Sequence, residues 1–226
     1  MNAIYHRQVL ERALGDHVSP RALEAIYQAN IGQDKLDGLL NHPEYHFDNN
    51  DVSGGLAYIE ECCAIAVQNA LAQPAEARAA FGRLTHAAQD FYSHSNYVAL
   101  WAEQQAPHPN PLPVGTSADG EMESLPAPET IDGLDPDLLK HPRLITCRVY
   151  MPLEALSFVP GLGSLAKRFL PKDSHAGMNL DNPSTGPLFP YSIEAAVQRT
   201  VAEYERTLAL IGEEHGEEGV RAFQGM

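Results

Sequence analysis

The chain has 226 residues, and 44% of them are hydrophobic, which suffices for the core of one domain of ordinary size. Its 15 Lys and Arg residues against 30 Asp and Glu residues give a formal net charge of −15. A field of that sign repels a phosphate backbone, so we expect no stable nucleic-acid partner and no binding to an anionic membrane without bound metal.

Apolar side chains recur at helical spacing along most of the chain, which predicts an all-α fold. Gly15 ends the first expected helix, and Ser19 with Pro20 caps and opens the second. The short β-branched run 145–149 is the only strand candidate. The expected helices cover residues 3–14, 20–32, 54–72, 74–104 and 187–211.

Two segments interrupt this helical pattern. Residues 106–143 contain eight prolines, too many for a regular helix, and a loop this long is usually a lid, a binding loop or a disordered insertion. Residues 152–170 mix apolar side chains with glycine and the basic pair Lys167 and Arg168. This second segment either packs on the core or forms a lip that faces lipid or substrate.

The stretch 86–96, HAAQDFYSHSN, is the most informative part of the sequence. His86, Asp90 and His94 follow one another at i, i+4 steps, so on a helix they share one face. Imidazole nitrogen with carboxylate oxygen is a ligand mix that suits zinc. A solvated polar stripe is the alternative, but the apolar neighbours turn these groups inward, where buried polar groups need partners. A transition-metal site is the first hypothesis.

Four other segments carry similar chemistry. His6 lies near the start of the first expected helix, and Asp34 follows the second. His46 stands in the turn HFDN, and His175 stands in SHAGMNLDNP. All four are candidate metal ligands.

Each candidate has a plain alternative. His6 could be an ordinary residue of an amphipathic helix, and either Asp34 or Asp37 could be a solvated charge after the second helix. His46 could be a hydrogen-bonded loop histidine. Asp48 is interpreted as structural, as the cap of the helix expected to begin near residue 54.

The order His, Asp, His, then His-x3-Asp on a helix, then two later histidines, resembles the zinc-dependent phospholipase C and zinc nuclease superfamily. The wording HFDN, QDFYSHSNYV and SHAGMNLDNP looks like its heterokaryon-incompatibility C (Het-C) branch. The resemblance runs from residue 3 to residue 211. It implies a single-domain helical bundle of the phospholipase C type over 1–226, with 106–143 as a long loop and two or three Zn²⁺ ions in a cleft.

The resemblance also implies the ligand sets. His6 would bind a third ion with Asp90 as a bridging ligand, a site that in secreted relatives also uses the free amino terminus. Where the family places Glu four residues after its last histidine, this chain has Asn179, and Asp181 is the expected substitute. The first site would use Asp34, His46, His86 and Asp90, and the second His94, His175 and Asp181.

For function, the resemblance implies a metal-dependent phosphoric-ester hydrolase. An activated water would attack a phosphodiester, with Asp34 as general base or orienting ligand. The substrate would be a phospholipid or another phosphodiester, reached through transient membrane contact. The alternative is a Het-C-like cell-death or interbacterial toxicity factor that acts by binding lipid or a partner.

Three cysteines, Cys62, Cys63 and Cys147, form neither a CxxC zinc pattern nor an even disulfide set, so we expect small buried residues or free thiols. No basic region followed by an apolar run marks a signal peptide, and no stretch approaches the ~20 apolar residues of a membrane span. The expected location is cytoplasmic, or exported by a route without a conventional signal peptide. A leader preceding the given sequence is the alternative.

Overall fold

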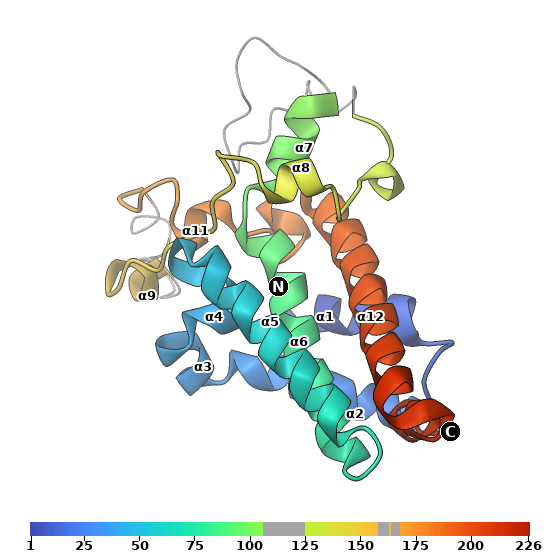
Figure 1. Cartoon of the computed structure of the whole chain (residues 1–226). Helices are drawn as coiled ribbons and strands as arrows, with labels where there is room; N and C mark the ends of the chain where they lie inside the picture. The colour runs from blue at the N-terminus through green and yellow to red at the C-terminus, as the bar shows by residue number, and fades with distance from the viewer. Residues whose placement is uncertain (106–124, 158–162, 164–167) are drawn as a thin grey trace.

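The computed structural model describes residues 1–105, 125–157, 163 and 168–226, and this described part contains helices and no strand (Figure 1). The predicted all-α class is therefore confirmed. The longer helices are α1 (Ala3–Leu14), α2 (Pro20–Ile31), α5 (Val52–Asn69), α6 (Pro74–His94), α7 (Tyr97–Gln105) and α12 (Phe189–Gln224). The shorter ones are α3 (Leu36–Asn41), α4 (Pro43–His46), α8 (Pro136–Leu139), α9 (Leu153–Ser157) and α11 (His175–Met178), with 3-10 turns η1 (Gly32–Asp34), η2 (Asp48–Asn50), η4 (Pro128–Thr130) and η5 (Pro183–Thr185).

Helix α6 is the central element, and it packs against α5, α2 and α12 (Figure 1). Every residue from Leu84 to His94 is buried, so this part of the helix meets protein on all its faces. One face is apolar and fills the core, while the face with His86, Asp90 and His94 carries polar groups into the interior. The helix that holds the core together therefore also carries the candidate site.

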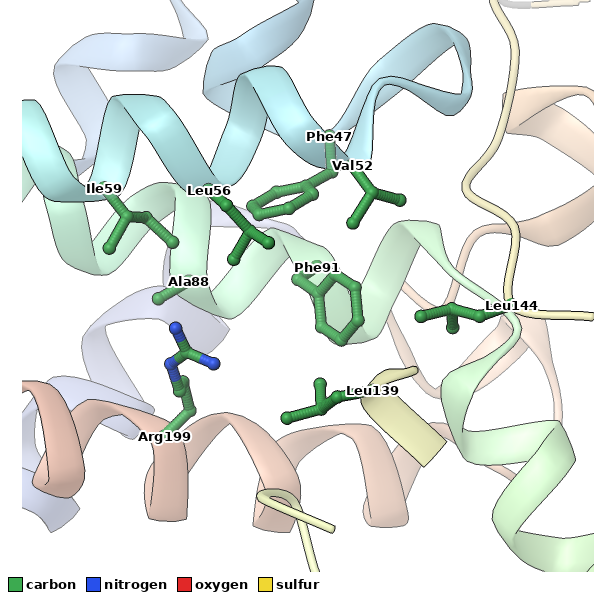
Figure 2. Close-up of a pocket in the computed structure, with 9 residues that line it drawn as sticks. All are labelled: Phe47, Val52, Leu56, Ile59, Ala88, Phe91, Leu139, Leu144 and Arg199. Carbon is green, nitrogen blue, oxygen red and sulfur yellow. The ribbon is translucent and has the colours of Figure 1, made fainter. Parts of the chain in front are cut away.

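A small apolar cavity lies between α5, α6 and α12, with a volume of about 80 Å³ (Figure 2). Phe47, Leu56, Ala88 and Phe91 are among the side chains that line it, and Arg199 is its charged group. Ala88 faces away from the polar side of α6, because two residues along a helix turn through about 200°. None of the predicted metal ligands lines this cavity.

Helices α2 and α6 approach each other closely at Gly82. A Cβ added there would lie 2.3 Å from the carbonyl oxygen of Ile26 and 2.8 Å from the Cβ of Ala29. Gly82→Ala should therefore lower the free energy of unfolding by about 1–3 kcal/mol, even though alanine is the better helix former.

The matched control for Gly82→Ala is Gly32→Ala. Gly32 has a φ of −62° and no atom within 4 Å of an added Cβ, so this variant should unfold like the wild type or slightly later. Urea unfolding of both variants is the measurement. Equal stabilities would contradict the tight crossing of α2 and α6.

The expected helix over 74–104 is wrong as one unit, because the chain breaks between α6 and α7. Asn96 explains the break: its Nδ2 donates to the carbonyl of Arg143 at 2.8 Å, and its Oδ1 accepts from the backbone N–H of Ile145 at 2.9 Å. The expected strand over 145–149 is wrong as well. That segment makes only isolated bridges, through Thr146 and Arg148, to Ser95 and Ser174.

Other boundaries differ less. The helix expected to begin near residue 54 begins at Val52, and Asp51 caps it by accepting from Gly54 N–H at 2.8 Å. The capping role predicted for Asp48 is therefore wrong. Helix α12 continues beyond 211 to Gln224, with Gly216 at a φ of +64° inside it.

The two irregular segments are described in part. Residues 106–124 of the expected loop lie outside the described residues, while 125–143 contain η4 and α8, each of which begins at a proline. Of the expected lip, residues 158–162 and 164–167 lie outside the described part. The three cysteines are buried and unpaired, as predicted. No helix among the described residues combines the length and apolar character needed to cross a membrane, as the sequence predicts.

Candidate metal centre

All eight predicted metal ligands meet around Asp90, although they come from five separate segments. Helix α6 supplies its polar face, and α1, η1, α4 and the segment that begins with α11 supply the other residues. The residues brought together are His6, Asp34, His46, His86, Asp90, His94, His175 and Asp181.

The first group consists of Asp34, His46, His86 and Asp90, whose nearest donor atoms all lie within 4.8 Å of one another. Asp90 Oδ2 lies 3.0 Å from His46 Nδ1 and 3.2 Å from His86 Nε2. Asp34 Oδ1 lies 3.6 Å from His86 Nε2. The side chain of Asp34 is 35% exposed while the other three are buried, so Asp34 marks the solvent side of this group.

The second group consists of His94, His175 and Asp181. His94 Nε2 lies 3.1 Å from Asp181 Oδ1 and 3.2 Å from His175 Nε2. The backbone places α11 here, because His175 N–H donates to the carbonyl of Arg148 and Leu180 N–H to that of Ser93. Asp181 therefore occupies the position for which the sequence expected a substitute carboxylate.

His6 forms a third group with Asp90. His6 Nε2 lies 3.3 Å from Asp90 Oδ1, and the amino group of Met1 lies 2.5 Å from the same oxygen and 2.9 Å from Asp181 Oδ1. The two oxygens of Asp90 thus serve different groups, since Oδ2 faces His46 and Oδ1 faces His6. A carboxylate placed in this way can bridge two cations.

The buried nitrogens of these groups fit a cation. His6 Nε2 and His46 Nε2 have no hydrogen-bond partner, although both side chains are buried. His86 Nε2 and His46 Nδ1 lie 3.1 Å apart, a nitrogen-to-nitrogen contact that needs a proton or a cation between the lone pairs. Nitrogen and oxygen donors in groups of three and four are the set that zinc takes in proteins.

Burial and charge divide the histidines into two kinds. Burial lowers the pKa of His86 to about 3, and burial with the nearby His94 lowers that of His175 to about 4, so both are neutral at neutral pH. Burial also acts to lower the pKa of His94, but the carboxylates of Asp90 and Asp181 outweigh it and raise the value to about 9. Without metal, His94 therefore carries a proton that a bound cation would displace.

The pKa values of the three aspartates also shift in different directions. Burial raises the pKa of Asp34, and the charge of Asp90 adds to this effect. Burial would also raise the pKa of Asp90, but the Met1 amino group and His94 hold it well below its usual range. Asp181 is held low by the same two neighbours against its own burial. Asp90 and Asp181 are therefore ionised, as ligands must be.

Sequence reasoning missed a further cluster behind His94. The thiol of Cys147 donates to Asp48 Oδ1 at 3.0 Å, and His94 Nδ1 lies 3.9 Å from the same oxygen. Burial and Asp48 raise the pKa of the Cys147 thiol well above its usual value, so it stays protonated. Asp48 and Cys147 are 99 positions apart and share no motif, so no sequence signal pairs them.

A sequence model described as the VWA7 N-terminal domain matches residues 4–120, just over half of the chain. Von Willebrand factor A domain-containing protein 7 of Homo sapiens is 40% identical over 88 residues, a stretch that covers 38% of this chain and 10% of that protein. The Rattus norvegicus and Mus musculus proteins of the same name are 38% and 36% identical over 88 residues. The matched stretch is thus about a tenth of each relative's length. No solved structure matches the chain.

These findings correct the resemblance inferred from the sequence. The assignment to the Het-C branch of the zinc-dependent phospholipase C superfamily is wrong, since the matching family is a different one. The functions that depended on it, a phospholipase C-like phosphodiester hydrolase or a Het-C-like cell-death and toxicity factor, are wrong for the same reason. The phospholipase C type of bundle depended on the same assignment and is not confirmed. With the match spanning residues 4–120, the chain belongs to the VWA7 N-terminal domain family.

Proposed function

We propose that this chain is a metal-binding domain that holds two or three divalent transition-metal ions, zinc foremost, around Asp90. The observation that carries the proposal is a set of buried imidazole nitrogens: His6 Nε2 and His46 Nε2 have no hydrogen-bond partner, and His46 Nδ1 lies 3.1 Å from His86 Nε2. Leaving such groups unpaired in the interior costs free energy, and a cation satisfies several of them at once.

The residues divide into three proposed ligand sets. Asp90 would serve two of them, because its oxygens face different histidines. A bound divalent ion would supply Lewis acidity and positive charge in the interior of an acidic protein. The proposed sets are Asp34, His46, His86 and Asp90; His94, His175 and Asp181; and His6 with Asp90.

The remaining expectations from the sequence stay predictions. They are that the chain is an enzyme, with Asp34 as its catalytic residue, and that it makes transient membrane contact but binds no nucleic acid stably. Asp34 has the properties that a general base at the edge of a site needs: it is one-third exposed, and burial raises its pKa. The carboxylate of the second group, Asp181, differs from Asp34 in this respect, because its neighbours lower its pKa.

Zinc should stabilise the folded domain, because the ligands come together only in the folded chain. At a free zinc concentration about 100 times Kd, mass action adds about 2.7 kcal/mol, which should raise the melting temperature by about 5–10 °C. The test is a thermal melt of chelator-treated protein with and without added zinc, beside elemental analysis of the purified protein.

Magnesium is the control in these melts, since it prefers six oxygen ligands and should shift the melt little. Purified protein with less than one equivalent of transition metal after zinc-supplemented expression would contradict the proposal. So would identical melts of the stripped and zinc-loaded protein.

A further inference from the structure

Two buried amides, Asn30 and Gln89, lie directly behind two of the proposed ligands. His6 Nδ1 lies 2.7 Å from Gln89 Oε1, and His86 Nδ1 lies 3.4 Å from Asn30 Oδ1. Asn30 Nδ2 also donates to Gln89 Oε1 at 3.3 Å, which joins the two amides. All four side chains are fully buried, so no water-exposed partner competes for these bonds.

Two threonines fix the direction of this chain of hydrogen bonds. Thr200 Oγ1 donates to the carbonyl of Ala196 at 2.7 Å, and its remaining lone pairs accept from Gln89 Nε2 at 3.1 Å. A carbonyl can only accept, so the hydroxyl proton is committed and cannot be offered to Gln89. The amide nitrogen of Gln89 must therefore face Thr200, and its oxygen must face the opposite way.

Thr85 does the same for the other amide. Its hydroxyl donates to the carbonyl of Gly82 at 2.9 Å and accepts from Asn30 Nδ2 at 3.1 Å. The nitrogen of Asn30 is thus held toward Thr85, and its oxygen faces His86. The orientations of the two amides follow from the backbone carbonyls of Gly82 and Ala196, at which these hydrogen bonds end.

An amide oxygen accepts and never donates, so the imidazole nitrogen that meets it must carry the proton. His6 and His86 are therefore protonated on Nδ1, and in the neutral imidazole with that proton Nε2 carries the free lone pair. Those Nε2 atoms lie 3.3 Å and 3.2 Å from the two oxygens of Asp90. Fixing a ligand's tautomer through its second nitrogen is how outer-shell groups tune metal sites.

We propose that Asn30 and Gln89, anchored by Thr85 and Thr200, form a relay that locks His6 and His86 in the Nδ1–H tautomer and so aims both Nε2 lone pairs at the metal centre. The four are positioning residues of that centre. Their effect on metal affinity rests on the proposed function, whereas their effect on the tautomers does not.

The test uses the double variant Thr85→Val and Thr200→Val, which removes both anchoring hydroxyls and keeps the side-chain shape. In metal-free wild-type protein at neutral pH, nitrogen NMR of the imidazoles should show His86 as a single Nδ1–H tautomer. In the double variant both amides can turn over, so His86 should become a mixture of tautomers. The matched control is Thr207→Val, a fully buried threonine of α12 whose hydroxyl lies near Cys63 and not near the relay.

Zinc affinity gives the second readout, measured by competition with a chelating dye. Gln89→Leu removes the oxygen that His6 meets and should weaken zinc binding about 10–100-fold, the usual cost of losing an outer-shell partner. The double threonine variant should also bind more weakly, and Thr207→Val should match the wild type. Circular dichroism of each variant checks that it is folded.

The outcomes separate the relay from the proposed function. An unchanged single tautomer of His86 in the folded double variant would overturn the relay, as would wild-type zinc affinity in both the double variant and folded Gln89→Leu. A wild-type protein that binds no zinc, but whose His86 tautomer is lost in the double variant, would support the relay and contradict the proposed metal-binding function.

Discussion

Asp90→Asn should remove at least one equivalent of zinc from the domain and weaken what remains by more than the ~10–100-fold that an outer-shell substitution costs. The Asp90 side chain is fully buried, and its oxygens lie within 3.3 Å of His6, His46 and His86. An asparagine of the same shape loses the negative charge and turns an N–H pair toward one of these histidines, so it can no longer bridge.

The same variant should destabilise the metal-free protein. His94 and the Met1 amino group both owe their protonated state in part to Asp90, and a buried cation that loses its partner costs about 3–5 kcal/mol. Elemental analysis and urea unfolding measure the two effects. The matched control is Asp48→Asn, a buried acid whose hydrogen bond runs to Cys147 and which should keep zinc in the first group. A full zinc complement in Asp90→Asn would exclude Asp90 as a bridging ligand.

The helices that the sequence located well are those whose signals are local. Ser19 accepts from Ala22 N–H, with Pro20 in the first turn, and α1 ends beside Gly15, as the capping patterns predict. The break after His94 has no local signal. It depends on Asn96 and a segment almost 50 residues further on, which compete for the backbone that a continuous helix would have used.

The candidate site also has one part that local sequence signals predict and one part that depends on tertiary contacts. The i, i+4 spacing of His86, Asp90 and His94 is visible in the sequence, and the structure places these side chains together. The relay behind them is invisible there, since Asn30 and Gln89 look like ordinary polar residues of amphipathic helices. Only tertiary packing turns them inward. The family resemblance was wrong, because short motifs of metal-binding residue types recur without common descent.

The metal-free protein should be most stable near pH 6.5 and lose stability on both sides. Below 6.5 the unfolded chain protonates its histidines, while His86 and His175, with pKa values of about 3 and 4, stay neutral in the fold. Each such group lowers the free energy of unfolding by about 1.4 kcal/mol per pH unit until its folded pKa is reached. Below the usual aspartate range, protonation of Asp90 and Asp181 in the unfolded chain extends the loss, because both pKa values are depressed in the fold.

Above pH 6.5 the sign reverses for His94. The folded pKa of His94 is raised to about 9, so its stabilising contribution is complete below 6.5 and disappears as the pH rises to 9, a loss of roughly 3 kcal/mol. Urea unfolding in chelator at a series of pH values measures both limbs. His94→Gln should remove the alkaline limb between pH 6.5 and 8, below the usual pKa of an α-amino group, and His17→Gln, at an exposed position, should change neither limb. Saturating zinc should also abolish the alkaline limb, because the ion replaces the His94 proton, and it should steepen the acid limb, because protons compete with the ion for the same nitrogens. An alkaline limb unchanged by zinc would mean that His94 keeps its proton and binds no metal.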